Sequence, residues 1–288
     1  MSKKVVLLGP NGYVGQNFKI LFNNKKDNLI CISRKDCDLL NKDKIFKILK
    51  QIKPNYIINA AGYTGKPNVD ACENNKDRCW RENVTLPKYL SDICQILDLK
   101  YIQVSSGCIY SGKKSKNGFK EVDEPNFSFD STPCSYYSGT KSVMEDIIKK
   151  DPNAYVCRLR IPFNNIANPK NYITKLLSYN KLLNAENSLT NINDFVEACY
   201  YLINNNCETG VYNITNTDSI TTKKVVEYIN KYITNKKFSF FKNEKEFYTI
   251  VAKTPRSNCI LDNSKLRKAG FKLKHINESI EEATKNYR

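Results

Sequence analysis

Two stretches decide the fold: Val104-Ser105-Ser106-Gly107-Cys108-Ile109-Tyr110 and, some thirty residues later, Tyr136-Tyr137-Ser138-Gly139-Thr140-Lys141. An apolar run precedes the serines and predicts a buried strand, so the small residues follow its carboxyl end, where open α/β sheets bind ligands. Tyr137 and Lys141 are four residues apart in a segment with helical spacing, which places phenol and ammonium on one face. A cation beside a phenol favours phenolate. Ser106, Tyr137 and Lys141 are therefore predicted to exchange a proton with a carbonyl or hydroxyl group.

A glycine-rich turn near the N-terminus indicates a dinucleotide site. An apolar strand at residues 4–8 is followed directly by the turn, and the stripe Val14, Phe18, Leu21 and Phe22 predicts a helix. Glycines permit close backbone approach, and free N–H groups at the helix start bind a pyrophosphate. The alternative is a turn that merely connects two elements. The residues predicted to contact the cofactor here are Gly9, Asn11, Gly12, Tyr13, Val14 and Gly15.

The second predicted strand, residues 29–33, ends at a serine and an arginine rather than at an acid. An acid at this place suits the ribose hydroxyls of NAD, whereas Ser33 and Arg34 suit a 2′-phosphate. NADPH is therefore the predicted cofactor, with NADH as the alternative, and Asp38 is predicted to contribute to the site. Arg34 could equally be an ordinary surface charge, because Asp36 and Asp38 lie just beyond it.

The order of elements predicts an α/β fold with a doubly wound parallel sheet. A third strand at residues 56–59 runs into Ala60-Ala61-Gly62, small residues that let a cofactor lie against the backbone. A long helical region to about Leu97 precedes the fourth strand, so the alternation is βαβαβαβ. Residues 111–134 form a long irregular connection that could serve as a substrate lid. We predict a cofactor domain at 1–163, completed by about 189–217, and a smaller lobe mainly at 164–288.

Length and composition narrow the class of protein. A chain of 288 residues can bury a substantial core. Its 11 cysteines include no Cys-x-x-Cys pair and its one histidine is His275, so neither a zinc site nor a disulfide framework has the right spacing. No apolar run reaches transmembrane length, and the first residues lead straight into a strand. We expect a cytoplasmic protein with reduced thiols, no bound metal and no membrane association.

The net charge of +17 raises the question of a nucleic-acid partner. Lysines are spread along the whole chain, with no dense block and no nucleic-acid-binding motif. We therefore expect no nucleic-acid partner. A lysine-rich coding bias with solvated helix faces explains the charge, although anionic ligands such as nucleotides would benefit from the same field.

Four motifs together resemble the extended short-chain dehydrogenase/reductases that act on nucleotide sugars. They are Gly9-x-x-Gly12-x-x-Gly15, Asn59-Ala60-Ala61-Gly62, Ser105-Ser106-Gly107-Cys108-Ile109-Tyr110 and Tyr137-x-x-x-Lys141. The resemblance covers nearly the whole chain. It implies a Rossmann-type domain that binds NAD(P), a smaller C-terminal substrate-binding lobe, and catalysis by Ser106, Tyr137 and Lys141, of which the last two also contact the cofactor.

Three further stretches, at residues 62–70, 168–175 and 255–258, look like one branch of this family. It comprises the bifunctional 3,5-epimerase/4-reductases, as in the C-terminal part of plant-type UDP-rhamnose synthases. The resemblance implies that UDP-4-keto-6-deoxyglucose is converted to UDP-L-rhamnose with NADPH. The residues it implies for substrate binding are Thr64, Asn68, Asn165, Lys175 and Arg256.

The chemistry of such a substrate supports a double activity. A 4-keto-6-deoxy sugar has acidic C–H bonds at C3 and C5, and inverting them needs groups that remove and return protons. Cys108 lies two residues beyond Ser106, and a thiol beside a cation ionises more easily. GDP-fucose synthases pair such a cysteine with a histidine, but His275 does not fit, and Lys175 matches the lysine of the rhamnose branch. Alternatively, Cys108 is a packing residue and Lys175 a solvated lysine or a phosphate contact.

Other functions remain open on the same motifs. One is a dTDP-4-dehydrorhamnose reductase with a single activity, and another is an epimerase/reductase similar to GDP-fucose synthases. A catalytically inactive, dinucleotide-binding regulatory protein is a third, although it would have no reason to keep Ser106, Tyr137 and Lys141 together. The resemblance also implies a homodimer and a functional link to an upstream 4,6-dehydratase.

Overall fold

A central sheet of six parallel strands organises the chain, which we describe from a computed structural model covering residues 2–66, 68–131, 133–252 and 254–288. The strands lie in the order β2-β1-β3-β4-β5-β10. Their bounds are Lys4–Leu8 for β1, Asn28–Ile32 for β2, Tyr56–Asn59 for β3, Lys100–Ser106 for β4, Ala154–Leu159 for β5 and Gly210–Asn213 for β10. The predicted parallel sheet is confirmed. Pro67, within the stretch 62–70, lies outside the described residues.

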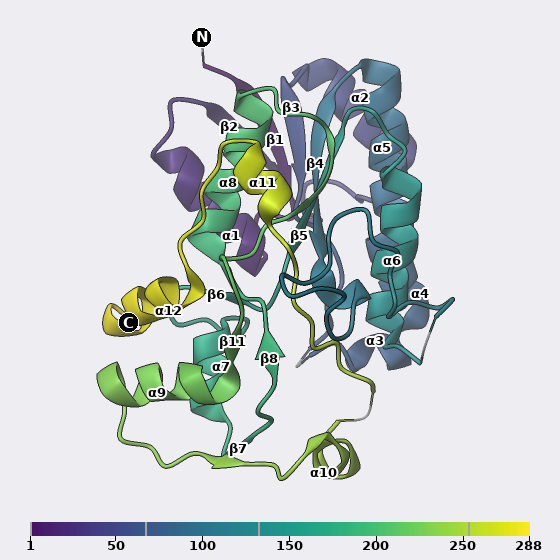
Figure 1. Cartoon of the computed structure of the whole chain (residues 1–288). Helices are drawn as coiled ribbons and strands as arrows, with labels where there is room; N and C mark the ends of the chain where they lie inside the picture. The colour runs from purple at the N-terminus through teal and green to yellow at the C-terminus, as the bar shows by residue number, and fades with distance from the viewer. Residues whose placement is uncertain (1, 67, 132, 253) are drawn as a thin grey trace.

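Helices cover both faces of the sheet (Figure 1). α1, α8 and α11 pack on one face, and α2, α5 and α6 on the other. Val5 and Leu7 of β1 point to the first group, whereas Val6 and Leu8 point to the second. Because both faces are buried, the strands read as continuous apolar runs. The bounds are Tyr13–Asn23 for α1, Lys42–Ile52 for α2, Leu86–Leu97 for α5, Tyr136–Ile148 for α6, Ile192–Asn204 for α8 and Ser264–Lys268 for α11.

A smaller group of elements lies beyond one end of the sheet, at the bottom of the view in Figure 1. Its core is a separate apolar cluster built mainly by α7, α9 and α12. The bounds are Tyr172–Ser178 for α7, Thr222–Tyr232 for α9, Glu244–Ile250 for α10 and Ile276–Lys285 for α12, with short strands at Pro162–Phe163 (β6), Lys181–Leu182 (β7), Glu186–Asn187 (β8), Thr190–Asn191 (β9), Ile220–Thr221 (β11) and Ser239–Phe240 (β12). The C-terminal part also returns to the sheet through α8 and β10. The exact division into 1–163 and 164–288 stays a prediction.

The long helical region predicted before β4 consists of several pieces. They are α3 (Ala71–Asn74), α4 (Lys76–Trp80), a π-helical turn η1 (Arg81–Thr85) and then α5. Pro87, in the first turn of α5, has no N–H to donate to the carbonyl of Asn83. The ladder is therefore interrupted at the π turn, and such turns often occur at functional sites.

A buried ion pair fixes helix α6 to the sheet. Arg158 of β5 contacts Glu145 of α6 at 2.6 Å, and both side chains are only 4% exposed. Ser105 of β4 donates to the same carboxylate at 2.5 Å. Since Glu145 lies one helical turn after Lys141, this network sets the position of the helix that carries the predicted catalytic pair.

Two negative findings apply to the described residues alone. No helix in them is long and apolar enough to cross a membrane. No group of three or more histidine, cysteine, aspartate or glutamate side chains among them could hold a metal ion.

Candidate active site

The glycine turn after β1 lies against the loop that follows β3, at the point where the strand order reverses. Gly9 has a φ of +76°, and a Cβ at this position would lie 2.6 Å from the backbone nitrogen of Ala61. At Gly15, a Cβ would come within 2.1 Å of the Gly9 carbonyl oxygen. Only glycine fits both positions. α1 begins after Gly12, where a Cβ would meet nothing closer than 3.6 Å, so this position is open to a ligand.

The side chains of the other predicted cofactor residues in this turn differ in their exposure to solvent. Asn11 is exposed, whereas Val14 packs against the core of the sheet. The hydroxyl of Tyr13 donates to Oδ1 of Asn164 at 3.1 Å, and burial raises the pKa of this phenol. Asn164 in turn accepts from Asn171, which caps α7. The first turn of α1 is thus connected to the helix that carries Lys175.

The end of β2 adjoins the same turn, because the Gly9 N–H donates to the carbonyl of Ile32. Arg34 follows this strand, and its exposed guanidinium contacts Glu82 at 3.2 Å. Asp38 accepts a bond from the N–H of Leu40, so its carboxylate shapes the local turn. Arg34 therefore lies just beyond the strand that adjoins the glycine turn, and its role in cofactor binding stays a prediction. Among the described residues, no contact of Asp38 supports a binding role.

The predicted catalytic side chains converge at the carboxyl end of β4. Ser106 ends this strand, and its hydroxyl accepts from the N–H of Cys108 at 3.3 Å, which starts the 3-10 turn η2 (Gly107–Ile109). Tyr137 lies in the first turn of α6, capped by Ser135. Its ring and the thiol of Cys108 belong to one apolar cluster. The structure therefore brings together a hydroxyl, a phenol and a thiol from two separate stretches.

Burial dominates the electrostatics of this phenol. It raises the pKa of Tyr137, the sulfur of Cys108 adds to the rise, and a hydrogen bond with Ser106 opposes it. Burial also lowers the pKa of Lys141, while Glu145 raises it. Nζ of Lys141 lies 6.0 Å from the centroid of the Tyr137 ring. Removal of the phenol from water therefore outweighs the influence of a cation at this distance, and the net effect is a raised pKa of Tyr137.

Lys141 also adjoins the small residues Ala60-Ala61-Gly62. A Cβ at Gly62 would meet Oδ1 of Asn83 at 3.0 Å and Nζ of Lys141 at 3.8 Å. The amide of Asn83 accepts from the N–H of Tyr63 at 2.8 Å and donates to the carbonyl of the same residue at 2.9 Å. Asn83 therefore holds the loop after β3 in place beside the ammonium group.

Several cations from distant parts of the chain gather around Lys175 on α7. Burial lowers the pKa of Lys175, the charges of Lys170 and Arg256 lower it further, and Cys108 acts in the opposite direction. Lys170 donates to Oγ1 of Thr64 at 3.2 Å and thereby joins the loop after β3 to the lobe. Thr64, Lys175 and Arg256, all predicted to bind substrate, thus lie in one region, and the concentration of positive charge there favours an anionic ligand.

Two other residues predicted to bind substrate have structural contacts. Asn68 accepts from the N–H of Asp70 at 2.8 Å and so shapes the loop near these cations. The side chain of Asn165 instead donates to the carbonyl of Asn286 at 3.5 Å, and its own carbonyl accepts from Arg288. Asn165 is therefore tied to the C-terminal segment, and its contacts do not connect it with the cations or with Cys108.

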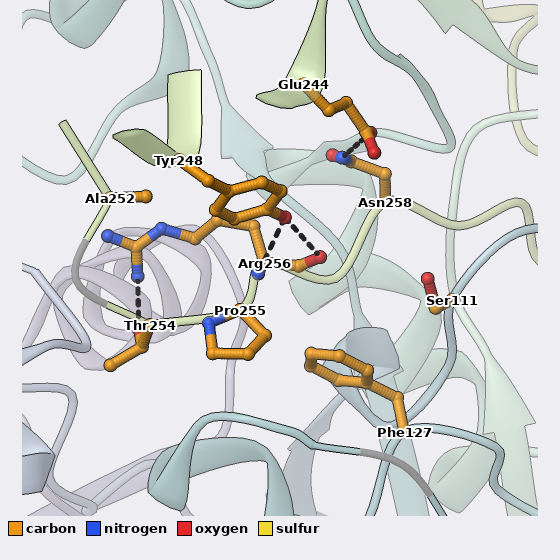
Figure 2. Close-up of a pocket in the computed structure, with 9 residues that line it drawn as sticks. All are labelled: Ser111, Phe127, Glu244, Tyr248, Ala252, Thr254, Pro255, Arg256 and Asn258. Atoms are coloured by element: carbon orange, nitrogen blue, oxygen red, sulfur yellow. Dashed lines mark hydrogen bonds between the residues drawn. The ribbon is translucent and has the colours of Figure 1, made fainter. Parts of the chain in front are cut away.

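A cavity of about 440 Å³ lies beside Arg256, between α10 and the irregular connection after β4 (Figure 2). The backbone N–H of Arg256 donates to the hydroxyl of Tyr248, and its guanidinium donates to Thr254 and forms an ion pair with Asp70 at 2.6 Å. Phe127 provides an apolar wall. This volume is within the range of pockets that bind small ligands.

Sequence reasoning missed the functional placement of Asn83 and Arg160. Asn83 is a buried amide within an otherwise apolar helical face, and that contrast was a readable signal. Arg160 ends the apolar run of β5, and one of its N–H groups donates to Sγ of Cys108 at 3.2 Å. An arginine at the carboxyl end of a buried strand was the corresponding signal, although its partner could not be read from spacing.

Comparison with known proteins shows the family of this chain. The model of the RmlD substrate binding domain matches residues 3–288. The chain belongs to the RmlD substrate-binding domain family. The membership confirms the predicted resemblance and the prediction of an enzyme that uses an NAD(P)H cofactor.

Two plant proteins and one solved structure illustrate the relationship. A bifunctional dTDP-4-dehydrorhamnose 3,5-epimerase/dTDP-4-dehydrorhamnose reductase of Arabidopsis thaliana is 36% identical over 84% of this RmlD-family chain and 80% of its own length. A trifunctional UDP-glucose 4,6-dehydratase/UDP-4-keto-6-deoxy-D-glucose 3,5-epimerase/UDP-4-keto-L-rhamnose-reductase of the same plant is 35% identical over 81% of this chain. The match spans only 35% of that longer protein. The L780 UDP-rhamnose synthase of Acanthamoeba polyphaga mimivirus has the same fold, with a TM-score of 0.91, 22% identity, and coverage of 99% of this chain and 100% of that one.

Proposed function

We propose that this chain is a bifunctional 3,5-epimerase/4-reductase that converts UDP-4-keto-6-deoxyglucose to UDP-L-rhamnose with NADPH. The observation that carries the proposal is the meeting of Cys108 with Ser106 and Tyr137 at the end of β4. A reductase needs the hydroxyl and the phenol, but it does not need a thiol beside them.

The reductase half rests on the buried phenol of Tyr137 and on the glycine turn. Gly9, Gly12, Gly15 and the loop Ala60-Ala61-Gly62 would hold the dinucleotide, and the open Gly12 position fits a pyrophosphate at the start of α1. NADPH would supply a hydride for C4 of the sugar. Tyr137 donates its proton to the oxygen at C4, and Ser106 holds that oxygen by a hydrogen bond. The exposed guanidinium of Arg34 favours the 2′-phosphate of NADPH over NADH.

The epimerase half uses Cys108 and Lys175. Sulfur takes the proton from C3 or C5: the C–H bond breaks, an S–H bond forms, and the electron pair moves to the C4 oxygen as an enolate. An ammonium group on the opposite face then returns a proton to the same carbon, which inverts it. Burial lowers the pKa of Lys175, so that this residue can both donate and accept a proton closer to neutral pH than an exposed lysine.

The substrate class follows from the cations around this centre. Lys170, Lys175 and Arg256 act on one another electrostatically, and a nucleotide diphosphate would offset their repulsion. The cavity next to Arg256 offers room for the nucleoside. UDP is proposed by similarity to the plant relatives, and dTDP and GDP sugars are competitors to be tested. A cytoplasmic location, a homodimer and supply of the keto sugar by a 4,6-dehydratase complete the proposal.

Proton NMR in D2O tests both halves in one experiment. The purified chain is mixed with UDP-4-keto-6-deoxyglucose, first without NADPH and then with it. We expect deuterium at C3 and C5 before NADPH is added, and UDP-L-rhamnose afterwards. Reduction without deuterium uptake would leave a simple reductase, and no reaction with any of the three nucleotide sugars would refute the proposal.

Matched variants assign the residues. Cys108→Ser is expected to lose deuterium uptake, whereas Cys134→Ser, a similarly half-buried thiol, should retain it. Tyr137→Phe is expected to lose NADPH oxidation, whereas Tyr136→Phe at the neighbouring position should retain it. Full exchange in Cys108→Ser would remove the thiol from the mechanism.

A further inference from the structure

Arg160 is a buried cation for which the described residues provide no carboxylate partner. It follows β5, only 3% of it is exposed, and none of the ion pairs in residues 2–66, 68–131, 133–252 and 254–288 includes it. Arg158, two residues earlier, is equally buried but contacts Glu145 at 2.6 Å. A buried charge without a counter-ion destabilises the fold unless hydrogen bonds compensate for the lost water. The contacts of Arg160 should therefore reveal what offsets this cost.

Three acceptors hold the guanidinium. One terminal nitrogen donates to Oδ1 of Asn187 at 2.7 Å and to the carbonyl of Ser257, and the other donates to Sγ of Cys108 at 3.2 Å. The amide and the carbonyl are neutral at every accessible pH. The sulfur is the only one of the three acceptors that can become an anion.

A second sulfur lies near the guanidinium but is engaged as a donor. The thiol of Cys259 donates to the carbonyl of Gly107 at 3.2 Å, and burial raises its pKa. It is also only 1% exposed, so no substrate can reach it. Cys108 is only partly buried and lies beside Tyr137. Cys108 is therefore the sulfur that can carry a negative charge where a substrate binds.

We propose that Arg160 is a positioning residue that stabilises Cys108 as a thiolate and aims its sulfur at the C–H bonds beside the substrate carbonyl. This inference rests on the proposed function of Cys108 in proton transfer. Arg160 itself gives up no proton. Its N–H group donates to the sulfur, and this bond weakens when the sulfur takes the proton from carbon and becomes a neutral thiol. The thiol then loses this proton to solvent water, and the same guanidinium favours that loss, which restores the thiolate for the next proton transfer.

Alkylation of the thiols in the full chain tests the proposal without a substrate. The protein is treated with iodoacetamide at several values between about pH 6 and pH 9.5, and the modified peptides are quantified by mass spectrometry. Cys31 is exposed and serves as an internal reference in the same molecule. We expect Cys108 in the unmodified chain to react about tenfold faster than Cys31 near pH 7, because only the thiolate reacts.

Two variants separate charge from packing. Arg160→Gln is expected to slow alkylation of Cys108 about tenfold near pH 7, with the difference disappearing at alkaline pH where any thiol ionises. Arg160→Lys should restore most of the rate, because it retains a cation at the same place. An Arg160→Gln rate that is unchanged at all pH values, or reduced equally at all of them, would overturn the proposal.

The unmodified chain keeps the proposal falsifiable if Arg160→Gln does not fold. Reaction of Cys108 no faster than Cys31 near pH 7 would overturn it directly. Failure of the proposed function gives a different result: alkylation of Cys108 depends on Arg160, but no deuterium enters C3 or C5. Deuterium uptake together with slow alkylation of Cys108 would refute the inference on Arg160 and leave the function standing.

Discussion

Substituting Gly12 with alanine should separate cofactor binding from folding. A Cβ at Gly12 would lie 3.6 Å from the carbonyl oxygen of Gly9, which is an ordinary contact. Alanine is a poorer N-cap than glycine by some tenths of a kcal/mol, but it also reduces the entropy of the unfolded chain. The two effects oppose each other, so we expect the free energy of unfolding to change by less than about 0.5 kcal/mol.

The same methyl group should weaken NADPH binding. It would stand on the open side of the turn, where a pyrophosphate must approach the N–H groups at the start of α1. Loss of one hydrogen bond to a charged group costs about 1.5–3 kcal/mol. We therefore expect the Kd for NADPH, measured by calorimetry, to rise by about 10- to 100-fold.

Gly15→Ala provides the contrast. Its Cβ would lie 2.1 Å from the Gly9 carbonyl oxygen and 2.9 Å from Cα of Pro10, so the backbone itself must move. Overpacking of this kind costs about 3 kcal/mol or more, and urea unfolding should show the loss together with the loss of NADPH binding. If Gly12→Ala binds NADPH with normal affinity, this turn is not the pyrophosphate site. If Gly15→Ala is as stable as the unmodified chain, the backbone around Gly9 does not lie as close to position 15 as the structure shows.

Three further perturbations test the ion pair, the cavity and the lysine. Glu145→Gln should lower the free energy of unfolding in urea by about 3–5 kcal/mol, since it leaves the charge of Arg158 buried and unpaired; a loss below about 1 kcal/mol would contradict this. Asp70→Asn removes the carboxylate that contacts Arg256, so UDP should bind about two- to tenfold more tightly by calorimetry at low salt; unchanged affinity would place the diphosphate elsewhere. Burial makes the pKa of Lys175 lower in the folded state than in the unfolded state. Between these two pKa values the folded state binds fewer protons than the unfolded state, so the free energy of unfolding rises with pH. Lys175→Met should therefore stabilise the chain at neutral pH, and this gain should vanish above about pH 10.4, where the unfolded lysine also loses its proton; a gain independent of pH would refute the electrostatic cause.

The parts of the fold that the sequence predicts well are formed by residues that lie close together in the sequence. The turn from Gly9 to Gly15 is recognisable because strand, glycines and helix follow one another within a few residues. Ser106 could be placed at a ligand-binding edge because it follows a buried strand, and Tyr137 could be paired with Lys141 because four residues separate them in a helical segment. The π turn η1 was not predicted, since an apolar helical stripe does not show where the hydrogen-bond ladder is interrupted.

The parts that sequence reasoning missed depend on partners far along the chain. Arg160 meets Cys108, Asn187 and Ser257, which come from three separate segments. No periodicity connects these positions, and each contact exists only because β4, β5 and the lobe come together. The raised pKa of Tyr137 could not be predicted for a related reason: spacing indicates a nearby cation, but desolvation of the phenol depends on how the whole cluster packs.

The location of the positive charges determines which of them can indicate a ligand. Many lysines lie on the surface and form exposed pairs such as Lys224 with Glu227, which contribute little to stability and indicate no ligand. Arg160 and Lys175 are different, because each is largely removed from water and no ion pair in the described part of the chain includes either of them. A protein retains such groups at a cost in stability where function requires them. The few buried cations near Cys108, rather than the net charge of +17, are therefore the positive charges that support the proposed anionic substrate and the proposed role of the thiol as a base.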